Sequence, residues 1–228
     1  MLKSIQSPLP QISPLLTPLM YRLAGDGVLR GYFRTLEVTG QDHLPKTGPV
    51  ILAPTHRSRW DALIIPYVTG RRVSGRDLYY MVSHDEMLGV QGWIIGRCGG
   101  FPVNTKAPSV SALRTGVELL RQGQALVVFP EGNIFRDRQI HPLKPGLARL
   151  ALQAAQRCEE AIKIVPILLE YAQPYPRWRS DVKVVIGAPL STHHYDLSRP
   201  KQAAPQLTRD LLRALQQLQE GRSLLCFA

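Results

Sequence analysis

The stretch Pro49-Val-Ile-Leu-Ala-Pro-Thr-His-Arg-Ser-Arg-Trp-Asp61 joins a short apolar run to a polar loop. Residues 50–53 predict a β-strand, because four apolar side chains follow one another without a helical period. Asp61 then begins a second apolar segment, which predicts a helix over residues 61–68. A strand followed directly by a helix is the repeating unit of α/β proteins, and the rest of the chain continues this order.

The same alternation extends toward both ends of the chain. The run 125–129 is apolar without alternation, so we expect a strand covered on both faces. Pro102 places the extended piece 99–103 at a sheet edge or a strand end. Further strands are predicted at 35–39, 77–82, 162–169 and 182–186, and further helices at 88–97, 109–121, 147–158 and 206–219. The prediction is one α/β domain over residues 35–228, with a mixed, mostly parallel sheet flanked by helices on both faces.

Residues 1–34 have a different character. The segment 9–23 is apolar but interrupted by prolines. We predict an amphipathic helical segment in a membrane interface, with three cations near lipid headgroups: Arg22, Arg30 and Arg34. A helix packed on the domain's own core is the alternative. No run of eighteen apolar residues predicts a membrane-spanning helix, and the N-terminus lacks the pattern of a secretory signal.

The chain is strongly basic, with 28 Lys and Arg against 17 Asp and Glu and a formal net charge of +11. This charge suits a surface that meets phosphate groups or anionic lipid. Nucleic acid is the competing partner, but the basic residues are scattered and accompany no helix-turn-helix, zinc-finger spacing or aromatic RNA-binding signature. We therefore predict a membrane surface, and no nucleic acid, as the partner.

The three cysteines lie far apart, at Cys98, Cys158 and Cys226. They show no paired spacing, which indicates free thiols and neither a disulfide framework nor a zinc site. Cys98 lies in Gly96-Arg-Cys-Gly-Gly100, where a nucleophilic thiol is one interpretation and a small buried thiol the more ordinary one.

His56 and Asp61 are the residues of the opening stretch that could carry chemistry. A histidine oriented by a carboxylate can remove a proton from a hydroxyl near neutral pH. Within one helix, residues five apart would point about 140° apart around the axis. At a strand-to-helix junction the carboxylate can instead fold back toward Nδ1 of the ring, so we expect that arrangement. An ordinary solvated histidine is the alternative.

A second candidate, Glu131, lies in Phe129-Pro-Glu-Gly132, directly after the predicted strand 125–129. Because sites in such sheets form at strand ends, Glu131 and His56 could face one crevice. The tetrapeptide could equally be a simple turn. Cations on the surrounding loops could bind a phosphate group, although each alone could be a solvated charge: Lys106, Arg136, Arg138 and Lys144.

Four blocks of the sequence occur in the order found in the glycerolipid acyltransferase family. The first, His56-Arg-Ser-Arg-Trp-Asp61, matches the family's histidine and aspartate separated by four residues. The others are Gly100-Phe-Pro-Val103, Phe129-Pro-Glu-Gly132 and Ile164-Val-Pro-Ile167, and the segments Val38 to Pro45 and Leu143-Lys-Pro-Gly146 are similar to further family segments. The chain thus resembles this family, whose best-known members are the 1-acyl-sn-glycerol-3-phosphate acyltransferases, over about residues 36–190.

The resemblance implies transfer of an acyl group from acyl-CoA or acyl carrier protein to the hydroxyl of a lysolipid, most directly 1-acyl-sn-glycerol-3-phosphate. His56 is implied as the general base, and Asp61 as the residue that fixes its tautomer and stabilises the imidazolium. Backbone N–H groups near the catalytic block would stabilise the oxyanion. No metal or cofactor is implied, and the expected location is the cytoplasmic face of a membrane. We predict substrate-binding residues at Phe101, Lys106, Glu131, Gly132, Arg136 and Lys144.

Two departures from the family pattern concern the acceptor. The phosphatidate-forming members usually continue the third block as Glu-Gly-Thr-Arg, whereas Ile134 occupies the arginine position in this chain. Thr105 similarly stands where the second block commonly has an arginine, with Lys106 after it. Arg136 and Lys106 could substitute from neighbouring positions, but a lysine is a point charge that does not reproduce the bidentate fork of arginine. A different lysophospholipid or hydroxylated lipid is therefore an alternative acceptor.

Two further classes of function compete with acyl transfer. One is metal-dependent hydrolysis, in which His56 and Asp61 would join His84 and either Asp85 or Glu86 as ligands. The other is a non-catalytic basic module that binds lipid or nucleic acid, and it depends on the net charge alone. The oligomeric state is left open by the sequence.

Overall fold

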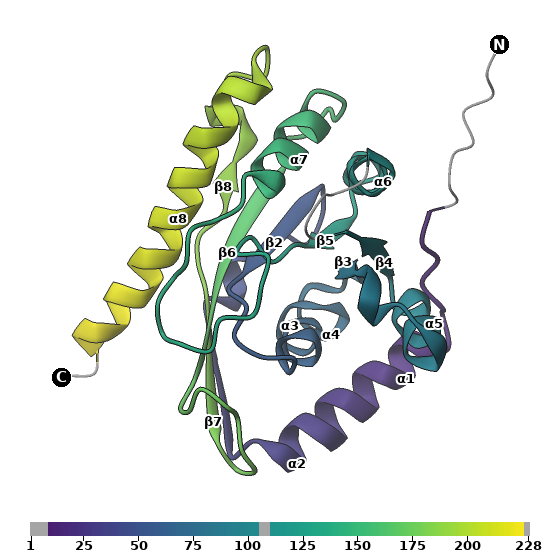
Figure 1. Cartoon of the computed structure of the whole chain (residues 1–228), viewed down its shortest axis with the longest axis vertical. Helices are drawn as coiled ribbons and strands as arrows, with labels where there is room; N and C mark the ends of the chain where they lie inside the picture. The colour runs from purple at the N-terminus through teal and green to yellow at the C-terminus, as the bar shows by residue number, and fades with distance from the viewer. Residues whose placement is uncertain (1–8, 105–109, 226–228) are drawn as a thin grey trace.

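The computed structural model describes residues 9–104 and 110–225. Within these residues the core is an eight-stranded sheet in the order β1-β7-β6-β2-β5-β3-β4, with β8 paired to β6 (Figure 1). The strands are β1 Thr35–Thr39, β2 Val50–Pro54, β3 Leu78–Ser83, β4 Gly100–Val103, β5 Ala125–Val127, β6 Lys163–Tyr171, β7 Asp181–Ile186 and β8 Leu190–Ser191.

The strand directions confirm the predicted mixed, mostly parallel sheet. β2 is parallel to both of its neighbours, β5 and β6, and β3 is parallel to β4 and β5. β6 is antiparallel to β7 and β8, while β1 pairs in parallel with β7. β4 lies at an edge, as Pro102 predicts. The central strand β2 is buried along its whole length, which explains its unbroken apolar sequence.

Helices cover both faces of the sheet, as predicted (Figure 1). One layer contains α6, α7 and α8, and the other contains α1, α3, α4 and α5. The helices are α1 Leu16–Arg22, α2 Arg30–Tyr32, α3 Asp61–Thr69, α4 Arg71–Ser74, α5 Gly89–Arg97, α6 Val110–Arg121, α7 Gly146–Ala155 and α8 Pro200–Leu225, with a π-helical turn Leu23–Leu29 and 3₁₀ turns Gln41–His43, His84–Glu86 and Thr192–His194.

Two elements differ in length from their sequence predictions. α8 begins at Pro200 rather than near Gln206, because Ala203 and Ala204 are buried and extend the apolar stripe toward the N-terminus. β5 ends at Val127, because the chain turns at Phe129-Pro-Glu-Gly132, where the Gly132 N–H donates to the Phe129 carbonyl. This early turn brings Glu131 to the edge of the sheet where β2 also ends.

The N-terminal segment is partly packed and partly exposed. Leu29 and Phe33 are buried in the cluster that also contains Ile64 of α3. A Cβ on Gly25 would lie 2.2 Å from the Tyr67 ring, so the π-helical turn and α3 are in close contact. Leu15 and Leu19 of the same segment are exposed. In the described part of the chain, no helix combines the length and the apolarity needed to span a bilayer.

Candidate active site

The carboxyl ends of β2 and β5 bring the predicted catalytic residues together. These neighbouring strands run parallel, so both end at the same edge of the sheet. His56 follows β2, Asp61 is the first residue of α3, and Glu131 follows β5. The structure therefore has the strand-to-helix junction that the five-residue spacing predicts.

His56 and Asp61 are in direct contact, with 2.8 Å between Nδ1 and Oδ2. A carboxylate oxygen can only accept, so Nδ1 carries the proton and Nε2 presents a lone pair. The imidazole also stacks on Phe129, with ring centroids 4.1 Å apart. Its side chain is 19% exposed, whereas that of Asp61 is fully buried. This is the geometry of a general base whose tautomer is fixed by its neighbour.

Asp61 accepts hydrogen bonds from four groups. Its Oδ2 receives the backbone N–H groups of Arg57 (2.6 Å) and Ser58 (2.9 Å) in addition to His56. Its Oδ1 receives the hydroxyl of Tyr171, at the end of β6, at 2.5 Å. These bonds offset the cost of burying the carboxylate and hold it in one orientation.

Residues 55–60, which join β2 to α3 and carry His56, form the catalytic loop. Glu131 is held by hydrogen bonds in the same way as Asp61, on the other side of this loop. Its carboxylate accepts from both terminal nitrogens of Arg57, at 2.7 and 3.1 Å, and from the backbone N–H of His56 at 2.9 Å. The backbone N–H of His141 adds a fourth bond at 3.0 Å. Both side chains of the Arg57–Glu131 pair are almost completely buried. Glu131 thus supports the loop that carries His56, and its direct contact with an acceptor stays a prediction.

The hydrogen bonds to Asp61 and Glu131 exclude three backbone N–H groups as oxyanion donors. The sequence predicts them among backbone N–H groups near the catalytic block. The N–H groups of His56, Arg57 and Ser58 all donate to Glu131 or Asp61. They are therefore committed to holding the loop, and an oxyanion would have to be stabilised by other donors.

The remaining predicted substrate-binding residues differ in their surroundings. Phe101 on β4 is 6% exposed and packs in the core on the α6–α8 side of the sheet. Gly132 has a φ of +69° and lies against Lys144, whose Nζ is 3.5 Å from the Gly132 carbonyl oxygen. Lys106 lies outside the described residues. A substrate-binding role for each of these residues stays a prediction.

Arg136, another predicted phosphate ligand, lies at a small cavity. It lines a cavity of about 130 Å³, together with Arg57, Arg138 and Tyr171. Arg57 and Tyr171 are the residues that hold Glu131 and Asp61, so this cavity adjoins the support of the catalytic pair. The Arg136 guanidinium lies 5.0 Å from the centroid of the Tyr175 ring, a cation–π distance.

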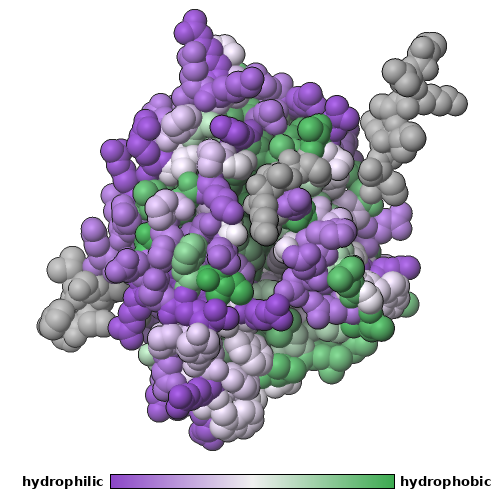
Figure 2. All heavy atoms as spheres, viewed as in Figure 1, coloured by the Kyte–Doolittle hydropathy of each residue, from purple (hydrophilic) through white to green (hydrophobic). Residues whose placement is uncertain are grey.

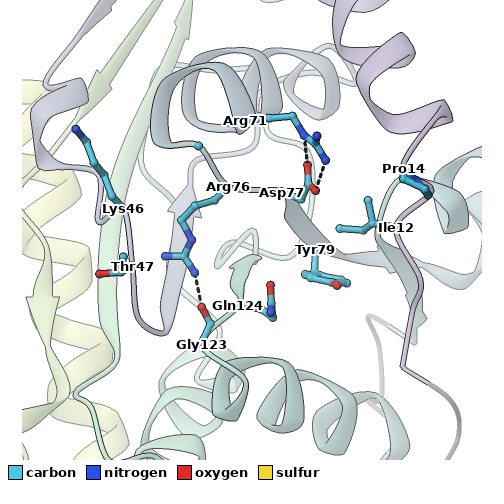
Figure 3. Close-up of a pocket in the computed structure, with 11 residues that line it drawn as sticks. Ile12, Pro14, Lys46, Thr47, Arg71, Arg76, Asp77, Tyr79, Gly123 and Gln124 are labelled. Carbon is cyan, nitrogen blue, oxygen red and sulfur yellow. Dashed lines mark hydrogen bonds and ion pairs between the residues drawn. The ribbon is translucent and has the colours of Figure 1, made fainter.

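A larger cavity of about 430 Å³ lies near the amino ends of β3 and β5, opposite the strand ends that carry His56 and Glu131 (Figure 3). Its lining includes Arg76 and Gln124, next to the starts of β3 and β5. Arg76 donates to the Gly123 carbonyl, and Arg71 pairs with Asp77 (Figure 3). Because His56 lies beyond the carboxyl ends of the strands, this larger cavity is separate from the catalytic pair.

The alternative chemistries find little support in the described residues. Burial raises the pKa of the Cys98 thiol, which lowers its thiolate fraction and its value as a nucleophile. No group of three or more His, Cys, Asp or Glu side chains is placed to hold a metal ion within residues 9–104 and 110–225. The ligand set that the metal-hydrolase hypothesis requires is therefore not assembled there.

A family model described as acyltransferase matches residues 35–170, which is more than half of the chain and includes His56, Asp61 and Glu131. The chain belongs to this acyltransferase family. The match contains the His56–Asp61 block and Phe129-Pro-Glu-Gly132, and it ends next to Tyr171.

The chain is also similar to named relatives and to a solved structure. It is 25% identical to the 1-acyl-sn-glycerol-3-phosphate acyltransferase of Streptococcus pneumoniae over 163 residues, 65% of this chain and 59% of that protein. The Bacillus subtilis protein of the same name is 23% identical over 194 residues, 81% of this chain and 88% of the relative. The crystal structure of PlsC, the 1-acyl-sn-glycerophosphate acyltransferase of Thermotoga maritima, has the same fold, with a TM-score of 0.69 and 15% identity over 90% of this chain and 79% of that one.

Two residues of the site, Arg57 and Tyr171, were absent from the sequence predictions. Arg57 lies within the catalytic block, and its alternation with Ser58 and Arg59 looks like a solvated loop. One signal could have identified Arg57: it lies in a loop directly after a strand that is predicted to be buried. A buried arginine requires a carboxylate partner, so such a residue points to a nearby Asp or Glu. Tyr171 ends a predicted strand, where its hydroxyl could equally have faced solvent.

Proposed function

We propose that this acyltransferase moves a fatty acyl group from acyl-CoA or acyl carrier protein to the free hydroxyl of a lysoglycerophospholipid. 1-Acyl-sn-glycerol-3-phosphate, which would give phosphatidate, is the leading acceptor. The observation that carries the proposal is the buried Asp61 bonded to Nδ1 of a partly exposed His56. The names of the matched relatives support the choice of acceptor.

The proposed reaction needs one base and no covalent enzyme intermediate. Nε2 of His56 removes the proton of the acceptor hydroxyl while that oxygen attacks the thioester carbonyl. Asp61 stabilises the imidazolium that forms. The carbon–sulfur bond then breaks, and the imidazolium gives its proton to the departing thiolate. The products are the new ester and the free thiol of the carrier.

Acceptor identity depends on the loop that follows Glu131. Ile134 occupies the position where phosphatidate-forming members usually have an arginine, and Arg136 lies two residues further along the same loop, at the small cavity that Arg138 also lines. We infer that Arg136 binds the acceptor phosphate at the small cavity beside Arg57. Another lysophospholipid remains the second candidate, because the arginine at position 134 is absent.

A panel of acceptors tests this assignment. We expect the highest kcat/KM with lysophosphatidate, and lower values with lysolipids whose phosphate carries a headgroup. Arg136→Gln should raise the KM for lysophosphatidate about tenfold, because a charged hydrogen bond to phosphate is lost. Arg149→Gln, at an exposed position on α7, is the control. Equal KM values in the parent and Arg136→Gln would show that the phosphate binds elsewhere.

We also propose that α1 and α5 together face a lipid surface, with the enzyme peripheral or monotopic at the cytoplasmic face of a membrane. Figure 2 has hydrophobic atoms gathered where Figure 1 draws these two helices. Leu15, the N-cap residue of α1, and Leu19 within α1 are exposed, as are Val90 (76%) and Trp93 (57%) on α5. The helices are joined because Ser13 N–H and the Thr17 hydroxyl both donate to the Arg97 carbonyl.

The charge and position of the α1–α5 surface favour a lipid bilayer as its binding partner. The Arg97 guanidinium lies over the Trp93 ring at 5.5 Å, and Arg22 is exposed at the end of α1. An aromatic ring with an adjacent cation suits the level of lipid headgroups. α5 also begins beside the catalytic loop, because Arg59 pairs with Glu86 at 2.5 Å just before that helix. A lipid acceptor in the bilayer would therefore be close to His56.

Vesicle binding tests this surface. The double variant Val90→Ser/Trp93→Ser should bind anionic phospholipid vesicles about tenfold more weakly than the parent, because buried apolar area is lost. Val110→Ser changes another exposed valine (64%), on α6 in the opposite helix layer, and should bind like the parent. Unchanged binding of the double variant would contradict this orientation.

A further inference from the structure

We propose that Tyr171 is a positioning residue of the acyl-transfer reaction, and that it acts by holding the Asp61 carboxylate against His56. The Tyr171 hydroxyl donates to Oδ1 of Asp61 at 2.5 Å. The assignment rests on the proposed function, because it concerns the step in which His56 removes the acceptor's proton.

The geometry of Asp61 gives Tyr171 a distinct place. Three donors converge on Oδ2, and all of them belong to the catalytic loop itself: the ring of His56 and the N–H groups of Arg57 and Ser58. Oδ1 instead receives a donor from β6, which is 110 residues away along the chain. Tyr171 therefore fixes the rotation of the carboxylate relative to the sheet, which the local contacts alone do not do.

The tyrosine is itself held rigidly and remains a donor. It is 7% exposed and belongs to the core cluster that contains Ile64 and Val184. Its ring lies against Phe33, with centroids 6.1 Å apart. Burial and the nearby Asp61 charge raise the pKa of Tyr171. The hydroxyl thus keeps its proton throughout the neutral range and is able to donate to the Asp61 carboxylate.

Tyr171→Phe removes the donor and keeps the ring. We expect kcat to fall about tenfold with little change in KM, the scale set by loss of one hydrogen bond to a charged group. Tyr195→Phe is the matched control, because the Tyr195 hydroxyl donates to Asp210 at 3.1 Å between the 3₁₀ turn and α8. Burial and Asp210 raise the pKa of Tyr195 to about 12, so it too is a protonated donor to a carboxylate.

A double-variant cycle separates positioning from a general effect on the fold. In the Asp61→Asn background, Tyr171→Phe should cost less than about twofold in kcat, because residues that act as a unit are not additive. A full tenfold loss in that background, or an equal loss in Tyr195→Phe, would overturn the proposal. A rise in KM with unchanged kcat would also overturn it.

Proton NMR tests the proposal without any substrate. The Nδ1 proton shared with Asp61 is expected to give a downfield resonance, identified by its absence in His56→Ala. Tyr171→Phe should shift or broaden this resonance, and Tyr195→Phe should leave it unchanged. A shift in an enzyme that turns over no lysolipid would mean that the proposed function fails while the positioning contact holds. An unchanged resonance would contradict the contact whatever the substrate.

Discussion

His56→Ala is expected to lower kcat for acyl transfer by about 10³-fold, because it removes the proposed general base. The side chain makes few structural contacts besides Asp61 and Phe129, and it is partly exposed. The variant should therefore fold, with a melting temperature close to that of the parent. The measurement is the rate of thiol release from acyl-CoA, or from acyl carrier protein, with a saturating lysolipid acceptor.

His84→Ala is the matched control for this loss. His84 is exposed on the 3₁₀ turn His84–Glu86 and belongs to the ligand set of the metal-hydrolase hypothesis. Acyl transfer predicts activity near that of the parent, whereas the metal hypothesis predicts a loss as large as in His56→Ala. Turnover in His56→Ala equal to the parent's would rule out His56 as the base.

Glu131→Gln is expected to lower the free energy of unfolding by about 3 kcal/mol, because it leaves the buried Arg57 guanidinium without a charged partner. For a chain of this size, that corresponds to a fall in melting temperature of roughly 6 to 12 °C. kcat should fall as well, since the same carboxylate accepts the backbone N–H of His56. Thermal unfolding and steady-state kinetics measure the two effects.

Glu118→Gln supplies the comparison. Glu118 also forms a two-nitrogen pair with an arginine, Arg121, but on the exposed surface of α6. Exposed pairs contribute up to about 1 kcal/mol, so this variant should melt near the parent. Equal melting of the two variants would contradict the structural role of Arg57–Glu131. A higher KM for the acceptor, with unchanged kcat and stability, would instead support direct binding by Glu131.

Much of the architecture follows from local sequence patterns. The apolar run 50–53 is a strand because a sheet covered by helices offers no solvent-facing side to its central strand. The five-residue spacing of His56 and Asp61 favoured a strand-to-helix junction, because residues five apart in one helix point in different directions. Element ends were less accurate, because the limit of α8 depends on packing against α7 and β6 rather than on propensity.

The supports of the site could not be read from local patterns. Arg57 and Glu131 are 74 residues apart, and Asp61 and Tyr171 are 110 apart. Each contact exists only because β5 and β6 flank β2 in the folded sheet. The sequence therefore indicated which residues could react, while the three-dimensional arrangement revealed which residues hold them in place.

The catalytic loop is anchored on both sides to the sheet, through Glu131 after β5 and Tyr171 on β6. These anchors hold the proposed base in one orientation before the substrate binds, so the reaction requires little reorganisation of the site. A rigid base cannot adapt to acceptors of different shape. If Arg136 binds the acceptor phosphate as proposed, we expect substitutions in the loop that carries Ile134 and Arg136 to change the choice of lipid without altering the proton transfer.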